Sequence, residues 1–147
     1  ANNSTVTITD GTISGCEGRW GGGLYAENSS TVIINNGTIS GCKARMGTGG
    51  GLYATNQSTI NINRGTISGC EAGAGGGLFV DSSTIRISGG IISECTTSDT
   101  GNGGGLYAKN STIKITGGRI ENNKAALGGG VALIGVTLIP LLSGLLG

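Results

Sequence analysis

The sequence repeats itself five times, and this repeat constrains the fold more than any other feature. Each copy contains Gly-Gly-Gly followed by an apolar residue, and successive copies are 25 to 28 residues apart. The motif begins at Gly21, Gly49, Gly75, Gly103 and Gly128. A period of this length is typical of a solenoid, in which each copy forms one structural unit that packs on its neighbours.

Each copy contains three short segments with strand character, separated by glycine or asparagine. In the first segment polar and apolar residues alternate, which places Val6 and Ile8 on one face of a strand. The second segment centres on an isoleucine two residues after a glycine, and the third follows the Gly-Gly-Gly motif. The predicted inward residues are Val6, Ile8, Val32, Ile34, Ile60, Ile62, Ile85, Ile87, Ile113 and Ile115 in the first segment, Ile13, Ile39, Ile67, Ile92 and Ile120 in the second, and Leu24, Ala26, Leu52, Ala54, Leu78, Val80, Leu106 and Ala108 in the third.

Strands this short bury their apolar face only when successive copies are coiled and stacked. The sequence therefore predicts an all-β fold, a right-handed single-stranded parallel β-helix (a solenoid) of about five coils of 25–28 residues. Three strands in each coil predict three parallel sheets, with neighbouring strands about 4.8 Å apart. The glycine runs suit corners that need a positive φ or a close passage of the backbone.

These motifs resemble the repeats of large bacterial β-helical adhesins and polymorphic outer-membrane proteins. In those repeats a Gly-Gly-small-apolar motif alternates with an aromatic-or-aliphatic-x-x-Asn motif, and residues 21–24 and 13–16 look like the two halves. Asn123 restores the asparagine that cysteine replaces in the other four copies. The resemblance covers residues 1–133 and implies a β-helix, a fold that serves adhesins, surface fibres and carbohydrate-active enzymes alike.

The chain changes character at its C-terminal end. No charged residue follows Lys124, and Pro140 would interrupt a ladder of strands. We therefore expect a repeat domain over residues 1–133 and an apolar cap or docking tail over residues 134–147, in preference to a membrane-spanning helix. The apolar residues of this tail are Leu138, Ile139, Leu141, Leu142, Leu145 and Leu146.

One cysteine per copy falls at the same corner of the repeat, at Cys16, Cys42, Cys70 and Cys95. Their spacing is the repeat period itself, not the Cys-x-x-Cys spacing of a zinc site. Disulfides between adjacent coils are possible, although parallel side chains hold the Cβ atoms further apart than a relaxed bridge prefers. We favour a ladder of small buried thiols with a structural role.

A second ladder is aromatic and consists of Tyr25, Tyr53, Phe79 and Tyr107. Each ring follows an inward leucine, so the rings are expected to point outward and stack along the helix. Such a strip can bind sugars, but rings at this spacing mostly bind each other. Asn-x-Ser/Thr sequons with exposed corner positions make Asn28, Asn36, Asn56 and Asn110 the candidates for glycosylation.

Catalysis is not expected from this composition. The chain contains no histidine, and its eight acidic residues scatter over different corners of the repeat, so neither a catalytic residue, a metal site nor a cofactor is predicted. The net charge of +1 does not suggest nucleic acid as a partner.

Together these features predict a non-catalytic, extracellular or cell-surface structural or adhesive rod that can assemble end to end into a filament or surface fibre. Its expected partner is another copy or another chain, bound through open coil ends and the apolar C-terminus, with glycans as further candidates. Membrane contact through the tail is less favoured. The alternative is a carbohydrate-binding or carbohydrate-active, polysaccharide lyase-like β-helix.

Overall fold

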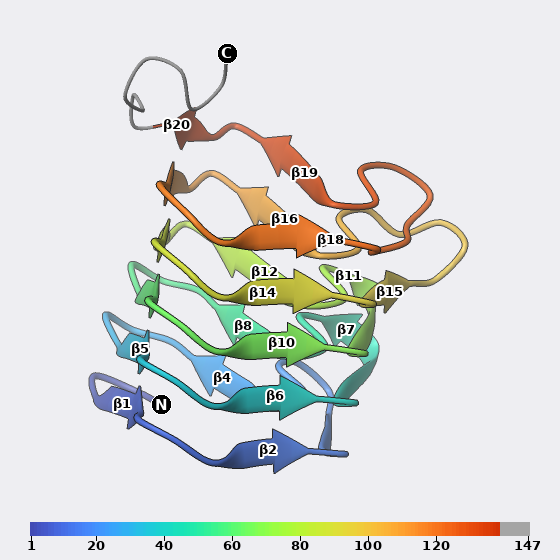
Figure 1. Ribbon diagram of the computed structural model, residues 1–147. Helices are drawn as coiled ribbons and strands as arrows, with labels where there is room; N and C mark the ends of the chain where they lie inside the picture. Colours follow the sequence, from blue (N-terminus) through green and yellow to red (C-terminus); the bar gives the residue numbers. More distant parts are fainter. Residues whose placement is uncertain (139–147) are drawn as a thin grey trace.

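In a computed structural model the chain winds into a stack of coils whose regular elements are short parallel strands joined by turns and loops (Figure 1). The structure describes residues 1–138, apart from the side chain of Met46. The predicted parallel β-helix of about five coils is confirmed, and the described part contains no helix.

The strands form four sheets, numbered in the order in which the chain visits them. Sheet 1 contains β1 (Thr5–Ile8), β5 (Thr31–Ile34), β9 (Thr59–Ile62), β13 (Thr84–Ile87), β17 (Thr112–Ile115) and β20 (Thr137–Leu138). Sheet 2 contains β2 (Thr12–Ser14), β6 (Thr38–Ser40), β10 (Thr66–Ser68), β14 (Ile91–Ser93) and β18 (Arg119–Glu121). Sheet 3 contains β3 (Glu17–Gly18), β7 (Lys43–Thr48), β11 (Glu71–Ala74) and β15 (Thr96–Thr97). Sheet 4 contains β4 (Leu24–Ala26), β8 (Leu52–Ala54), β12 (Leu78–Asp81), β16 (Leu106–Lys109) and β19 (Val131–Ile134).

Equivalent residues of successive coils lie directly over one another. Ile34 pairs with Ile62 and Ile62 with Ile87 in sheet 1, and the isoleucines of sheet 2 follow the same register. The inward columns predicted from the alternation are therefore present and form one narrow core. Its most deeply buried large side chains are Ile34, Ile39, Leu52, Ile60, Ile62, Ile67, Leu78, Ile85, Ile92, Leu106, Ile113 and Val32.

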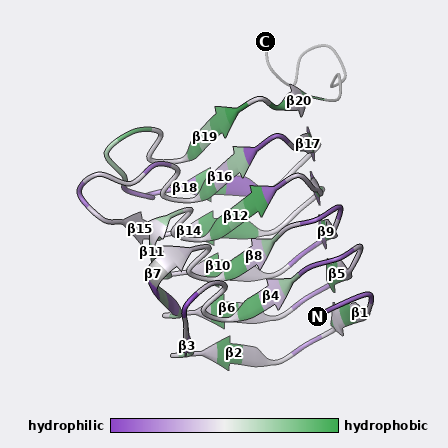
Figure 2. Cartoon of the chain, turned by 180° about the vertical axis from the view of Figure 1, so that it is seen from behind, coloured by the Kyte–Doolittle hydropathy of each residue, from purple (hydrophilic) through white to green (hydrophobic). Residues whose placement is uncertain are grey.

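The prediction of three sheets was wrong, because sheet 3 forms a fourth ladder between the cysteine corner and the Gly-Gly-Gly motif. Its strands are polar or glycine-rich, and in Figure 2 β7 and β11 are pale where strands of sheets 2 and 4 have hydrophobic colour. Backbone groups of adjacent coils pair here because the neighbouring sheets already hold the coils in register. Coil length also varies here: the step from the corner Cys or Asn to the next Gly-Gly-Gly is 5, 7, 5, 8 and 5 residues.

The three glycines of each motif have different tasks, as the second coil illustrates. Gly49 has φ +70°, which favours glycine. A Cβ on Gly50 would lie 2.5 Å from the carbonyl oxygen of Glu71 and would also collide with that of Gly76 in the next coil. A Cβ on Gly51 would meet Ile67 Cγ2 at 2.9 Å and Cys70 Sγ at 3.3 Å. The motif therefore lets backbone pass backbone at a corner where no side chain fits.

A column of buried serines ties the turns between sheets 4 and 1 together. Ser30 and Ser58 are 0% and 1% exposed. The Ser58 hydroxyl accepts a hydrogen bond from the Ser30 N–H of the preceding coil (3.2 Å) and donates to the Thr55 carbonyl of its own coil (2.8 Å). Ser83 and Ser111 continue the same pattern. Each hydroxyl thus satisfies backbone groups that the turn would otherwise bury without partners.

Candidate functional site

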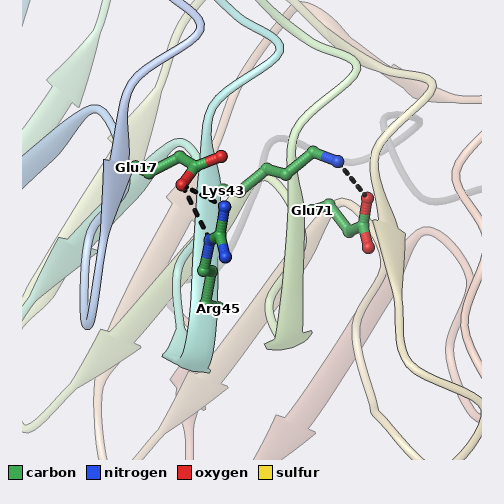
Figure 3. Close-up of polar contacts among 4 residues, drawn as sticks. All are labelled: Glu17, Lys43, Arg45 and Glu71. Carbon is green, nitrogen blue, oxygen red and sulfur yellow. Dashed lines mark hydrogen bonds and ion pairs between the residues drawn. The ribbon is translucent and has the colours of Figure 1, made fainter.

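Sheet 3 presents a charged surface that was not foreseen from the sequence. Glu17, Lys43 and Glu71 occupy register positions on β3, β7 and β11, so that charges of alternating sign lie one coil apart. With Arg45 they line an open groove of about 380 Å³ (Figure 3). The sequence signal was present, since polar residues flank a buried alanine in residues 43–45 and in Glu71-Ala72, but the alternation is short and the small alanine makes it easy to miss.

These charges are neutralised by one another. Arg45 donates to Glu17 Oε2 through both Nη2 and Nε at 2.7 Å, and Lys43 Nζ lies 3.4 Å from Glu71 Oε2. The side chains are about half exposed or more, so each pair contributes only about 0 to 1 kcal/mol to stability. Each ion pair joins neighbouring coils (Figure 3), which suits the surface to aligning coils.

The single tryptophan lies at the edge of this surface. Trp20 is 49% exposed, and the Arg19 guanidinium lies over its ring, 5.0 Å from the centroid. The indole edge packs on Gly47 of the next coil so closely that a Cβ there would collide with Trp20 Cδ1. Trp20 therefore links the first two coils, a role that no repeat pattern reveals because the other copies lack it.

The cysteine corner lies inside the helix. Cys42, Cys70 and Cys95 are fully buried, Cys16 of the first coil is half-buried, and all four thiols are free. Each buried thiol lies 3.8 to 3.9 Å from the isoleucine carbonyl of the preceding coil. In the last coil Asn123 donates to the Ile92 carbonyl (3.0 Å) and accepts from the Cys95 N–H (2.9 Å). The thiols thus occupy the place that asparagine takes in the fifth copy.

Two of the three buried thiols are weaker acids than an exposed cysteine, whereas a hydrogen bond with Cys70 lowers the pKa of Cys95. Burial raises the pKa of Cys42 to about 11, and a hydrogen bond with Cys95, followed by burial, raises the pKa of Cys70. Because alkylation requires the thiolate, a pKa of about 11 leaves only about one Cys42 thiol in a thousand reactive at pH 8.

We therefore expect N-ethylmaleimide at pH 8 to modify Cys16 first and the other three cysteines slowly, as measured by intact mass. Raising the pH toward 11 should speed the reaction of Cys42, because more of its thiol ionises. Full modification in guanidinium chloride is the control. Rapid modification of all four native thiols would contradict an inward corner.

The aromatic ladder stacks along sheet 4. The ring centroids of Tyr25 and Tyr53 are 5.2 Å apart at an interplanar angle of 5°, and Phe79 and Tyr107 continue the column at 5.2 and 4.9 Å. The Tyr25 hydroxyl donates to Glu27 Oε2 (3.2 Å), and burial, then this bond, raises the pKa of Tyr25. Tyr25 and Tyr53 turn their faces toward one another, whereas the contacts of Phe79 with Tyr53 and Tyr107 are tilted by 35° and 49°, so the rings bind one another along the ladder.

The candidate glycosylation sites are all exposed, but their surroundings differ. Asn28, Asn56 and Asn110 adopt φ values of 53°, 52° and 49° at one corner. Asn56 donates its amide to Asn28 (3.2 Å), and Asn28 donates to Asn2 (3.2 Å). A glycan on Asn28 or Asn56 would replace one amide hydrogen within this ladder, whereas Asn36 lies outside it. Glycosylation stays a prediction.

The apolar end of the chain is described only in part. Leu133, Ile134 and Leu138 are 42%, 51% and 56% exposed, and β19 and β20 carry sheets 4 and 1 onward at this end. Ile139, Leu141, Leu142, Leu145 and Leu146 of the predicted tail lie outside the described residues. Among the residues described, no helix has the length and apolar character needed to cross a membrane.

Residues 1–138 contain no group of three or more His, Cys, Asp or Glu side chains arranged to hold a metal ion.

The family model described as "Right handed beta helix region" matches residues 1–137. No curated protein and no solved structure matches the chain. The matched residues include nearly all of the stack, from β1 into β20.

Proposed function

Because the chain belongs to the right-handed β-helix family, we propose that this repeat protein is a non-catalytic structural and adhesive rod of the extracellular space or cell surface. The observation that carries the proposal is the common register of all coils. Each strand of sheets 1, 2 and 4 pairs in parallel with the equivalent strand of the next coil. A stack with one continuous core and ladders on several sides resists bending, which suits a rod that holds its surfaces at fixed spacing.

The chemistry of the charged surface on sheet 3 supports a structural role. Glu17 forms an ion pair with Arg45, and Glu71 forms one with Lys43. Both pairs join neighbouring coils. The buried polar groups have the same character, since the serine and cysteine columns bind backbone groups of their own and neighbouring coils.

The two end coils suit contact with a second copy. Within residues 1–138 the last coil presents exposed Leu133, Ile134 and Leu138, and its strands β19 and β20 are edge strands, which bind further strands readily. In sheet 3 the register column runs from Glu17 through Lys43, Glu71 and Thr96 to Lys124. Placing a second copy on this end would bring its Glu17 toward Lys124, which continues the alternation of charge. Contacts of this head-to-tail kind extend into filaments.

Sedimentation velocity of the 147-residue chain tests this proposal. We expect elongated species whose size grows with protein concentration, because each added copy leaves a new end exposed. Ile134→Asp should shift the distribution toward monomer, since it places a charge in the apolar contact. Asn61→Asp, at a half-exposed outward position on β9 in the middle of the stack, is the matched control and should assemble like the wild type. A monomer at every concentration, with Ile134→Asp indistinguishable from wild type, would contradict assembly through the ends.

A further inference from the structure

Four free thiols form a column inside the helix, one in each of the first four coils. They belong to Cys16, Cys42, Cys70 and Cys95, called the thiol column below, and each directly precedes a strand of sheet 3. The carbonyl of each of the first three accepts a hydrogen bond of 2.8 to 2.9 Å from the residue that follows the cysteine of the next coil. The cysteine backbones are therefore stacked at the spacing of neighbouring strands, about 4.8 Å.

The side chains of the thiol column share one orientation, because their contacts repeat from coil to coil. Each sulfur atom lies 3.3 to 3.5 Å from the carbonyl oxygen of the serine two residues before it. Each of the three fully buried sulfur atoms also lies against the third glycine of the Gly-Gly-Gly motif in the preceding coil, where an added Cβ would meet it at 3.2 to 3.3 Å. Neighbouring sulfur atoms are therefore also about one strand spacing apart, about 4.8 Å.

This spacing disfavours a disulfide but fits an ion between two sulfur atoms. A relaxed disulfide needs Cβ atoms about 3.5 to 4.5 Å apart and sulfur atoms about 2 Å apart, so two coils would have to move together. Bonds from a metal ion to a thiolate are about 2.3 Å long, and two of them in a straight line span about 4.6 Å. An ion midway between neighbouring sulfur atoms would thus form two bonds while the coils keep their places.

We propose that neighbouring members of the thiol column bind a soft cation, Hg(II) or Cu(I), in linear two-coordinate geometry. Two thiols release their protons to solvent and two metal–sulfur bonds form, with no change of oxidation state. Two thiolates neutralise Hg(II), whereas Cu(I) leaves one negative charge in the apolar core and should bind less tightly. Since each sulfur atom serves one ion, the four thiols hold two ions. Zn(II) needs four ligands in a tetrahedron, which a single column does not supply.

The half-buried Cys16 gives an ion access to the column from the first coil. Native mass spectrometry of the reduced 147-residue chain with mercuric chloride tests the inference. The wild type is expected to take up two ions. Each should displace two protons and keep no chloride, because both of its bonds go to sulfur atoms of the protein. The ions are counted per chain, so the result does not depend on assembly through the ends.

Two double variants test the spacing, and each keeps two fully buried thiols. Cys16→Ser/Cys95→Ser keeps Cys42 and Cys70 in neighbouring coils and should bind one ion that displaces two protons. Cys16→Ser/Cys70→Ser keeps Cys42 and Cys95, which are two coils apart, and should bind none in this form. Both variants replace Cys16 and one fully buried cysteine by the similarly small serine, so circular dichroism is expected to give similar melting for the two.

A wild-type stoichiometry other than two ions, or ions that keep a chloride, would overturn the inference. Equal uptake by the two variants would also overturn it, because the spacing of the thiols would then not matter. Binding of Zn(II) in the same amount as Hg(II) would contradict the linear geometry. If a variant fails to fold, the number of ions and of displaced protons in the wild type decides.

Discussion

Ile62→Asp is expected to unfold the stack at room temperature or to lower its melting temperature drastically. Ile62 is 2% exposed and lies between Ile34 and Ile87 of the neighbouring coils. A carboxylate there would lie in a core without a basic partner, which costs several kcal/mol. Such a penalty is comparable to a large part of the stability of an ordinary domain.

The adjacent residue provides the control, because Asn61 lies on the same strand and faces outward. Asn61→Asp should change the free energy of unfolding by about half a kcal/mol or less. Thermal melting followed by circular dichroism compares the two variants. Similar melting temperatures would mean that the inward and outward faces of β9 have been assigned in reverse.

Gly50→Ala is expected to destabilise the helix by about 3 kcal/mol or more, although it adds a single methyl group. That methyl group would lie within 2.5 to 2.6 Å of the Glu71 backbone and would collide with the Gly76 carbonyl oxygen. All of these atoms belong to the backbone of the next coil, so no side chain can rotate away. Two coils would have to separate, at the expense of several hydrogen bonds between them.

A glycine at another corner distinguishes steric crowding of an added Cβ from the effect of a positive φ. Gly41 has φ +59°, yet the nearest atom to an added Cβ is 4.0 Å away. Glu94 and Asn122 fill the equivalent position in later coils, both with φ 55°. Gly41→Asn should therefore cost less than about 1 kcal/mol. Urea unfolding measures the free energy of unfolding of both variants. Equal losses of stability would contradict the explanation that Gly50 is needed because backbone passes so close to it.

The sequence predicts those parts of the structure that repeat with an apolar period. Alternation in residues such as Val32 and Ile34 is sufficient to place sheet 1, and the glycine motif marks the corner before sheet 4. Sheet 3 escapes prediction because its alternation around Lys43 rests on one small alanine and is absent from β15, and because its pairing depends on coils that other sheets already hold in place. The groove lined by Arg64 and Arg119 escapes for a related reason: these residues are 55 positions apart in sequence, and only the coil register brings them together.

The serines illustrate a different limit. A serine recurs at the position of Ser30 and Ser58 in the repeat. The sequence alone, however, does not reveal whether a small polar residue faces solvent or a backbone group. Burial and the paired hydrogen bonds of each hydroxyl answer that question only once the turns are placed. Trp20 is the opposite case. It packs closely on Gly47 of the next coil, but no equivalent residue in the other copies points to this contact.

The uneven spacing of the coils has a consequence for how such a chain can change. The second coil has two residues more than the first between its cysteine and its glycine motif, and β7 and β11 absorb them through a register shift between Ala72 and Ala74. The fourth coil has three extra residues there, and its exposed turn follows β15. In both coils the inward residues on either side keep their places. Sheet 3 is therefore the part of each coil that can accept inserted residues during evolution, or a grafted foreign peptide, without disturbing the neighbouring coils.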